Sequence, residues 1–113
     1  MLLIVEPVGQ RRERGLEAGQ QVYQQMLDYS AELQSAGVLV ASNSLSTRAQ
    51  RLSLRDGGAR LIDGPFAEAK EMVGGFFYLN CATRDEALAW ARRCPAAAWA
   101  TVEVREVGPC YDD

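Results

Sequence analysis

The chain has 113 residues, 48% of them hydrophobic and 24% charged, and carries a formal net charge of −3. This is an ordinary globular composition, and a chain of this length can bury roughly two thirds of its surface around one core, so a disordered chain is excluded. The basic residues are scattered, apart from Arg11, Arg12 and Arg14, which argues against nucleic-acid binding.

The apolar run over residues 2–5 is too short for a signal peptide or a membrane helix, so we expect a cytoplasmic protein that does not insert into a membrane. The three cysteines, Cys81, Cys94 and Cys110, lie far apart, and the chain has no histidine. These spacings favour reduced thiols over a disulfide framework or a zinc site. Phosphate-binding glycine motifs and carboxylate clusters with metal-ligand spacing are absent from the sequence, so no cofactor or metal is predicted.

The first elements in chain order are a strand and a long helix. Residues 2–5 predict a buried strand, and residues 10–15 predict a polar connector. A long amphipathic helix is predicted over residues 16–36, ending at Gly37 as a natural C-cap. Its apolar or half-apolar positions recur at three- and four-residue steps at Tyr23, Met26, Ser30 and Leu33.

Strands dominate the middle of the chain. Residues 38–41 predict a strand beside the first one, followed by a loop over residues 43–47. Residues 51–55 alternate with period two, and the sequence Asp-Gly-Gly at 56–58 predicts a turn from which residues 60–62 return as a hairpin. Residues 73–81 are apolar on both parities, which predicts a central strand.

The C-terminal part predicts a second helix and a last strand. Thr83 and Glu86 form a capping box, in which each side chain can satisfy a free amide at a helix start. Pro95 is expected to stop this helix. Residues 101–105 alternate and predict a half-buried strand. We therefore expect one domain over residues 1–107 and a loose tail over residues 108–113.

With the extra strand of the hairpin left out, the element order is β-α-β-β-α-β, which predicts an α+β fold of the ferredoxin-like kind, with two helices on one face of an antiparallel sheet. The other face needs a cover, because the strand with Phe76, Phe77, Tyr78 and Leu79 is apolar on both sides. A second copy that packs sheet against sheet would provide it, so a homodimer is predicted. Closure of the face by the chain's own loops and tail is the alternative.

The segment Asp63-Gly64-Pro65-Phe66-Ala67-Glu68-Ala69-Lys70-Glu71, followed by two glycines and an aromatic strand, is similar to the signature of the DGPF group within the YCII-related family. The opening strand, the helices and the final strand also resemble their counterparts, up to Val107. The resemblance implies a bacterial protein built as a dimeric α+β barrel, with a cleft beside the sheet in each subunit.

In the wider family a His and an Asp have been taken as a catalytic pair, and at least one relative acts as a dehydrochlorinase in a chlorinated aromatic ring-cleavage pathway. The resemblance carries only the Asp to this chain, at Asp63, because no histidine is present. Any acid–base role would then fall to a carboxylate. Asp63 has two interpretations: it accepts the amides of Phe66 or Ala67 and fixes the turn, or apolar neighbours such as Phe66 and Phe76 desolvate it as a general base.

Most of the other candidate residues also have two interpretations. Gly64 supplies an unusual backbone angle, Glu68 and Lys70 belong either to a solvated face or to a ligand site, and Gly74 and Gly75 mark either a bulge or a close approach. The predicted ligand-binding residues are Asp63, Gly64, Pro65, Phe66, Glu68, Lys70, Gly75 and Phe76.

Three functions follow from this sequence. The first is a small-molecule binding protein with a cleft near Asp63 and a regulatory or accessory role. The second is a cofactor-free lyase or isomerase that uses Asp63 as general acid or base. The third is a protein-interaction partner without a ligand.

Overall fold

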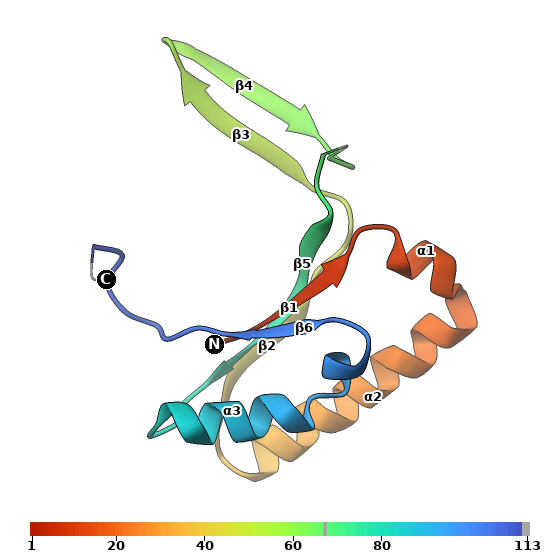
Figure 1. The fold of residues 1–113 in the computed structure, drawn as a ribbon, viewed down its shortest axis with the longest axis vertical. Coiled ribbons are helices and arrows are strands. Elements are labelled where there is room, and N and C mark those ends of the chain that lie inside the picture. The colour runs from red at the N-terminus through yellow and green to blue at the C-terminus, as the bar shows by residue number, and fades with distance from the viewer. Residues whose placement is uncertain (67, 112–113) are drawn as a thin grey trace.

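A computed structural model of the protein describes residues 1–66 and 68–111. Figure 1 shows helices beside a twisted sheet and a hairpin that projects away from both. In chain order the elements are β1 (Leu2–Pro7), α1 (Gln10–Arg14), α2 (Leu16–Ser35), β2 (Leu39–Ser44), β3 (Gln50–Arg55), β4 (Gly58–Asp63), β5 (Glu71–Leu79), α3 (Arg84–Arg93), the 3₁₀ turn η1 (Pro95–Ala98) and β6 (Thr101–Val104). The end of the predicted tail, residues 112–113, lies outside the described residues, as does Ala67.

The main sheet has four antiparallel strands in the order β2-β5-β1-β6. If the strands of this sheet are numbered 1 to 4 in chain order, their order across the sheet is 2-3-1-4. Helix α2 connects the inner strand β1 to the outer strand β2, and α3 connects the inner strand β5 to the outer strand β6. This is the ferredoxin-like arrangement that the element order predicts. The α+β fold class is therefore confirmed, and β5 is an inner strand as expected.

The core lies between the helices and one face of this sheet. Leu2 and Ile4 of β1 are buried there beside Phe77 of β5, and Tyr29 and Leu33 of α2 cover them. The rings of Tyr29 and Phe77 meet edge to face with centroids 5.2 Å apart. The Tyr29 hydroxyl donates a 2.6 Å hydrogen bond to the carbonyl of Trp90, which ties α2 to α3. Packing and one buried polar contact together fix the helices on the sheet.

The opposite face of the sheet is apolar and partly open. Its side chains alternate with the core positions, so Leu3 and Val5 of β1 share it with Phe76 and Tyr78 of β5. These four residues are half-buried, and Val73 on the same face is 43% exposed. The two-sided apolar character expected of β5 is thus present.

The hairpin β3-β4 forms a two-stranded sheet of its own, outside the main sheet. Its strands join through Asp56 and Gly57, both at positive φ (52° and 78°), as the turn sequence predicts. Leu52 and Leu61 pair across the strands and are 67% and 60% exposed. The projection makes the radius of gyration 16.1 Å, against about 13 Å for a compact domain of this length.

Several boundaries differ from the predictions. The expected connector over residues 10–15 is the short helix α1, which the sequence concealed because none of its residues is buried. Strand β1 runs on through Glu6 and Pro7, and β2 includes two residues expected in a loop. The capping box is confirmed: the Thr83 hydroxyl accepts the amide of Glu86 at 3.1 Å, and the Glu86 carboxylate accepts the amide of Ala82 at 3.0 Å.

Candidate ligand cleft

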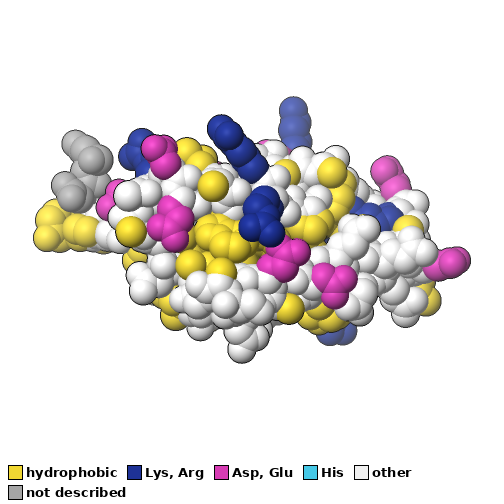
Figure 2. Space-filling model, turned by 90° about the horizontal axis from the view of Figure 1, so that it is seen from below, with side chains coloured by type: hydrophobic (Ala, Val, Ile, Leu, Met, Phe, Trp, Pro, Cys, Tyr) yellow, Lys and Arg dark blue, Asp and Glu magenta, His cyan; other side chains and the backbone are white. Residues whose placement is uncertain are grey.

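A cleft of about 830 Å³ opens between residues 16–30 of α2 and the strands β1, β2 and β5, within the size range of small-molecule sites. Figure 2, which views the molecule from the side of α2 and α3, shows apolar side chains gathered in the middle of this side with charged ones around them. The cleft is lined by Ile4, Glu6, Arg11, Arg12, Arg14, Gly15, Leu16, Gly19, Gln20, Val22, Tyr23, Met26, Leu27, Ser30, Ser42, Asn43, Ser44, Gly74, Gly75, Phe76, Phe77 and Trp99.

The cleft exists because α2 packs on the sheet along only part of its length. In its second half Tyr29 and Leu33 are buried against β1 and β5. In its first half Tyr23 is 54% exposed and Leu16 is 80% exposed, although Tyr23 belongs to the stripe predicted to face the core. The apolar stripe therefore does two things: one half closes the core, and the other leaves an apolar wall open to a ligand.

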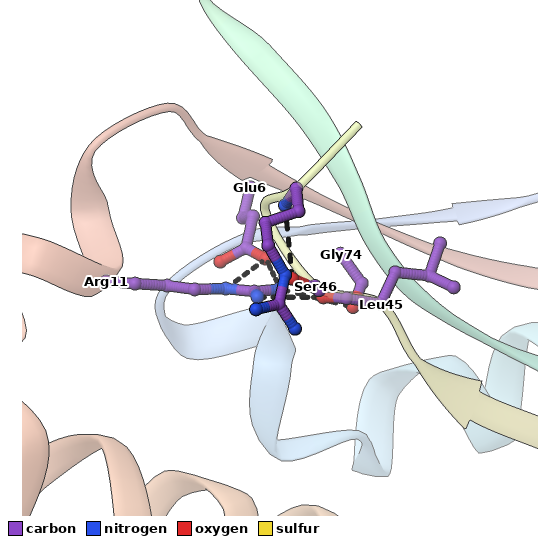
Figure 3. Close-up of polar contacts among 6 residues, drawn as sticks. Glu6, Arg11, Leu45, Ser46 and Gly74 are labelled. Atoms are coloured by element: carbon purple, nitrogen blue, oxygen red, sulfur yellow. Dashed lines mark hydrogen bonds and ion pairs between the residues drawn. The ribbon is translucent and has the colours of Figure 1, made fainter. Parts of the chain in front are cut away.

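Glu6 supplies the carboxylate of the cleft. It follows Leu2 and Ile4 at the same parity of β1, so its side chain turns to the helix face and is only 2% exposed. Arg11 of α1 pairs with it: the Nε and Nη2 atoms of the guanidinium both donate to Oε1 of Glu6, the former at 3.0 Å (Figure 3). Because both bonds end on Oε1, Oε2 keeps its capacity to accept a hydrogen bond from a ligand.

Arg11 also ties the surrounding backbone together. Its Nη1 donates to the carbonyl of Leu45 at 2.8 Å, and its Nη2 lies 3.3 Å from the carbonyl of Gly74 (Figure 3). The pairing register of β1 and β5 shifts at Gly74, which is the extra residue of a β-bulge. A Cβ atom at Gly74 would overlap the Glu6 carboxylate. The bulge and the missing side chain together make the space in which the buried charge pair sits.

Gly75 fits the second interpretation of the glycine pair, a close approach between two strands. An added Cβ there would lie 3.0 Å from the carbonyl oxygen of Asn43 in β2. The glycine pair thus serves both as a bulge and as a close approach of two strands, one residue for each role.

Two further arginines stand at the α1 end of the cleft. The guanidinium carbon of Arg14 lies 4.6 Å from the centroid of the Trp99 ring, a cation–π contact that holds the side chain over the cleft wall. Arg12 is exposed. On the β2 side the lining is polar and neutral, with Ser42, Asn43 and Ser44. The cleft therefore combines apolar walls, hydrogen-bonding groups and an excess of positive charge.

The predicted residue Asp63 lies elsewhere, exposed at the end of β4. Its Oδ1 accepts a 2.6 Å hydrogen bond from Nε2 of Gln50 across the hairpin, and not the amide bond expected from Phe66. The expected bond from Ala67 falls outside the described residues. Asp63 is not desolvated by Phe66 or Phe76 within the described chain, so its role as a general base stays a prediction.

The other signature residues surround Asp63 and not the cleft. Gly64 is not at positive φ, contrary to expectation; a side chain there would meet the carbonyl of Ala49 at 3.1 Å. The ring of Phe66 lies 3.8 Å beneath the guanidinium carbon of Arg51. Pro65, Glu68 and Lys70 are exposed. Among the predicted ligand-binding residues, Gly75 and Phe76 line the cleft.

Sequence reasoning missed Glu6 and Arg11, although a signal for Glu6 was present. An acidic residue two positions beyond Leu2 and Ile4 falls on the buried side of a strand that continues past the apolar run. Arg11 carried no comparable signal, because its helix is short and polar. Two buried ionisable groups lie outside the cleft, the hydroxyl of Tyr29 and the thiol of Cys94. Burial raises the pKa of both, so both stay neutral near pH 7.

Among the described residues there is no group of three or more acidic or cysteine side chains that could hold a metal ion. No helix in the described part of the chain combines the length and the apolar character needed to cross a bilayer.

An antiparallel α+β domain with a cleft between its long helix and its sheet is the class that this structure defines. The sequence matches the YCII-related domain over residues 5–110, and the chain belongs to that family. It is also similar to an uncharacterised protein of Rhizobium meliloti (strain 1021), with 47% identity over 47 residues. That alignment covers 42% of this chain and 38% of the relative, so the chain matches well under half of that protein.

Proposed function

We propose that this YCII-related protein binds a small organic molecule in the cleft between α2 and the sheet. The observation that carries the proposal is Glu6, a buried carboxylate at the cleft wall that Arg11 neutralises through one oxygen. Burying a charge in this way costs several kcal/mol before its pairing, and apolar residues of similar volume are often at least as stabilising. Polar groups held in an apolar cleft are what a ligand site needs to orient its ligand.

The walls support the same proposal. Apolar side chains of α2, namely Val22, Tyr23 and Met26, line the cleft and are half-buried or exposed, while the strand residues Ile4 and Phe77 lie buried at its floor. An apolar body would displace water from the helix side chains, and the neutral polar side chains of β2 would supply directional contacts. A purely structural role would be better served by a helix packed on the sheet along its whole length.

The test is to fill the cleft without damaging the fold. Gly19 of α2 lines the cleft, and nothing lies within 4 Å of a Cβ atom built there, so Gly19→Leu extends a side chain into the space. Ala31→Leu, at an exposed position of the same helix outside the cleft, is the matched control. Protein-observed NMR with a set of small aromatic and aliphatic compounds should give cleft-centred shifts in wild type and in Ala31→Leu but not in Gly19→Leu.

Compounds that shift wild type and Gly19→Leu equally would place any binding outside the cleft and refute the proposal. The same would follow if no compound bound wild type at millimolar concentration.

We further propose that the chain works as a homodimer through the open face of the main sheet. In support, Leu3, Val5, Val73 and Tyr78 make that face apolar, and the hairpin carries exposed leucines on a two-stranded ribbon, which is marginal in water without support. A second copy related by a two-fold axis satisfies both surfaces at once.

Sedimentation at micromolar concentrations tests the dimer. Val73→Glu places a charge in the open face and should shift the chain to monomer mass, whereas Val107→Glu, at an exposed valine beyond β6, should not. Monomer mass for wild type would overturn the dimer and leave the cleft proposal standing.

A further inference from the structure

We propose that the cleft selects a small organic anion, a carboxylate on an apolar body, and that Arg12 and Arg14 bind its negative end. This inference rests on the proposed function and names the ligand class of the same site. It follows from three features: the charge balance of the lining, the way Arg14 is held, and the apolar depth of the cleft.

The cleft lining is net positive, whereas the whole chain is net negative. Three arginines and one glutamate line it, in a protein whose formal net charge is −3. The glutamate is committed to Arg11. Arg12 and Arg14 take part in none of the ion pairs found in the described chain, which join Glu6 to Arg11, Glu32 to Arg93 and Glu103 to Arg105. The positive charge at the α1 end is therefore available to a ligand.

Arg14 is held where a ligand would meet it. Its guanidinium carbon lies 4.6 Å from the centroid of the Trp99 ring, and none of the ion pairs found in the described chain uses its N–H donors, so these donors can bind a carboxylate in a two-pronged contact. The side chain is half-buried, so less conformational entropy is lost on binding than for a freely moving arginine. Arg12, exposed at the same end, adds a second charge that attracts anions from solution.

The rest of the cleft limits which anions fit. Beyond the arginines, the α2 side and the floor of the cleft are apolar, with Val22, Met26 and Phe77, and the β2 side carries neutral polar groups, so an inorganic anion would leave most of the volume unused. Glu6 lies toward the sheet and would repel a second negative charge there, while its Oε2 accepts a hydrogen bond. The preferred ligand is thus singly charged at one end, apolar in its body and neutral, or a hydrogen-bond donor, at the other.

The experiment compares three probes of the same shape and different charge: benzoate, benzamide and benzamidinium. Each is titrated into wild-type protein at low salt and followed by amide NMR shifts. Benzoate should bind at least about tenfold more tightly than benzamide, benzamidinium should bind most weakly, and the advantage of benzoate should shrink as sodium chloride is raised.

Variants locate the effect. Arg12→Gln and Arg14→Gln should each weaken benzoate binding about three- to tenfold and leave benzamide nearly unchanged. Arg92→Gln, at an exposed arginine of α3 outside the cleft, is the control and should behave as wild type.

Failure of this inference can be told apart from failure of the proposed function. Equal binding of benzoate and benzamide, with both blocked by Gly19→Leu, would overturn anion selection and keep the cleft as a ligand site. Benzoate binding that Arg92→Gln weakens as much as Arg14→Gln would also overturn it, as a general charge effect. No binding of any probe would overturn both.

Discussion

Two carboxylates in different surroundings show how differently the same chemical group can be used. Glu6 is buried at the wall of the cleft, carries an arginine on one oxygen and sits against a glycine bulge. Asp63 belongs to the signature that identifies the DGPF group, yet it is exposed on a projecting hairpin and accepts one hydrogen bond from Gln50. The carboxylate in the motif is exposed to water, and the carboxylate outside the motif is buried in the cleft wall.

The difference shows that a sequence signature can identify a family without containing the residues that are buried in a cleft. Burial gives a carboxylate its energetic consequences, because a charge in water is screened and a charge in a cleft wall must be paired. The predictions below contrast buried with exposed groups by these consequences, beginning with the largest effect.

Replacing Arg11 by Met should destabilise the protein most. The change leaves Glu6 buried without its partner and removes the contact to the Leu45 carbonyl, so the free energy of unfolding at pH 7 should fall by about 3–5 kcal/mol. Urea unfolding measures it. The matched control is Arg93→Met, which breaks an exposed pair with Glu32 and should cost about 0–1 kcal/mol through that pair.

A double variant, Glu6→Gln with Arg11→Met, sharpens the same point. It removes the unpaired charge and should recover part of the loss. Equal losses for Arg11→Met and Arg93→Met would show that Glu6 is not buried as described.

The same contrast between buried and exposed groups extends to the tyrosines. Tyr29→Phe deletes the hydrogen bond to the Trp90 carbonyl and should cost about 1 kcal/mol at pH 7, while Tyr111→Phe, at an 88% exposed position, should cost almost nothing.

The two tyrosine variants should also differ in alkaline solution. Burial raises the pKa of Tyr29 above its ordinary value of 10.0, so above pH 10 the unfolded chain releases a proton that the folded chain keeps. Stability from this group is complete below pH 10 and is lost as the pH rises beyond it. Tyr29→Phe should therefore lose stability less steeply above pH 10 than wild type, as followed by thermal unfolding. Identical slopes would contradict the burial of the hydroxyl.

Asp63→Asn should have the smallest effect on the fold, within about 0.5 kcal/mol of wild type, because the side chain is exposed and an amide can still bond to Gln50. A loss of several kcal/mol would mean that the carboxylate is buried in the assembled protein. The prediction that Asp63 acts as general acid or base in a cofactor-free lyase or isomerase is tested with the same variant, since an activity unchanged by Asp63→Asn would refute it.

Much of the fold followed from local signals. The Asp-Gly turn placed the hairpin, the Thr83 capping box placed the start of α3, and the stripe through Leu33 placed α2, because each is decided by a few neighbouring residues. The cleft could not be predicted from such local signals. It depends on where α2 leaves the sheet, which is a matter of the angle between two elements and not of any local pattern.

The position of Asp63 was equally hidden. Periodicity predicts that β3 and β4 pair with each other, but not that the pair stands away from the other four strands. The sequence predicts Phe66 and Phe76 as apolar neighbours that desolvate Asp63, but Asp63 is exposed in the described chain. The exposed leucines of the ribbon are the reason to look for them in a second copy.

The glycine bulge has a consequence for how this sequence can change over time. The Glu6 and Arg11 side chains fill the space beside Gly74 and neutralise each other's charge. A substitution at any one of these three positions therefore alters what is permitted at the other two. Gly74→Ala should be poorly tolerated beside Glu6 and accepted once residue 6 is shortened to Ser or Ala, with Arg11 then free to become an uncharged residue. These three positions are expected to drift together or not at all, and a family alignment should show them varying as a unit while the exposed signature residues vary one by one.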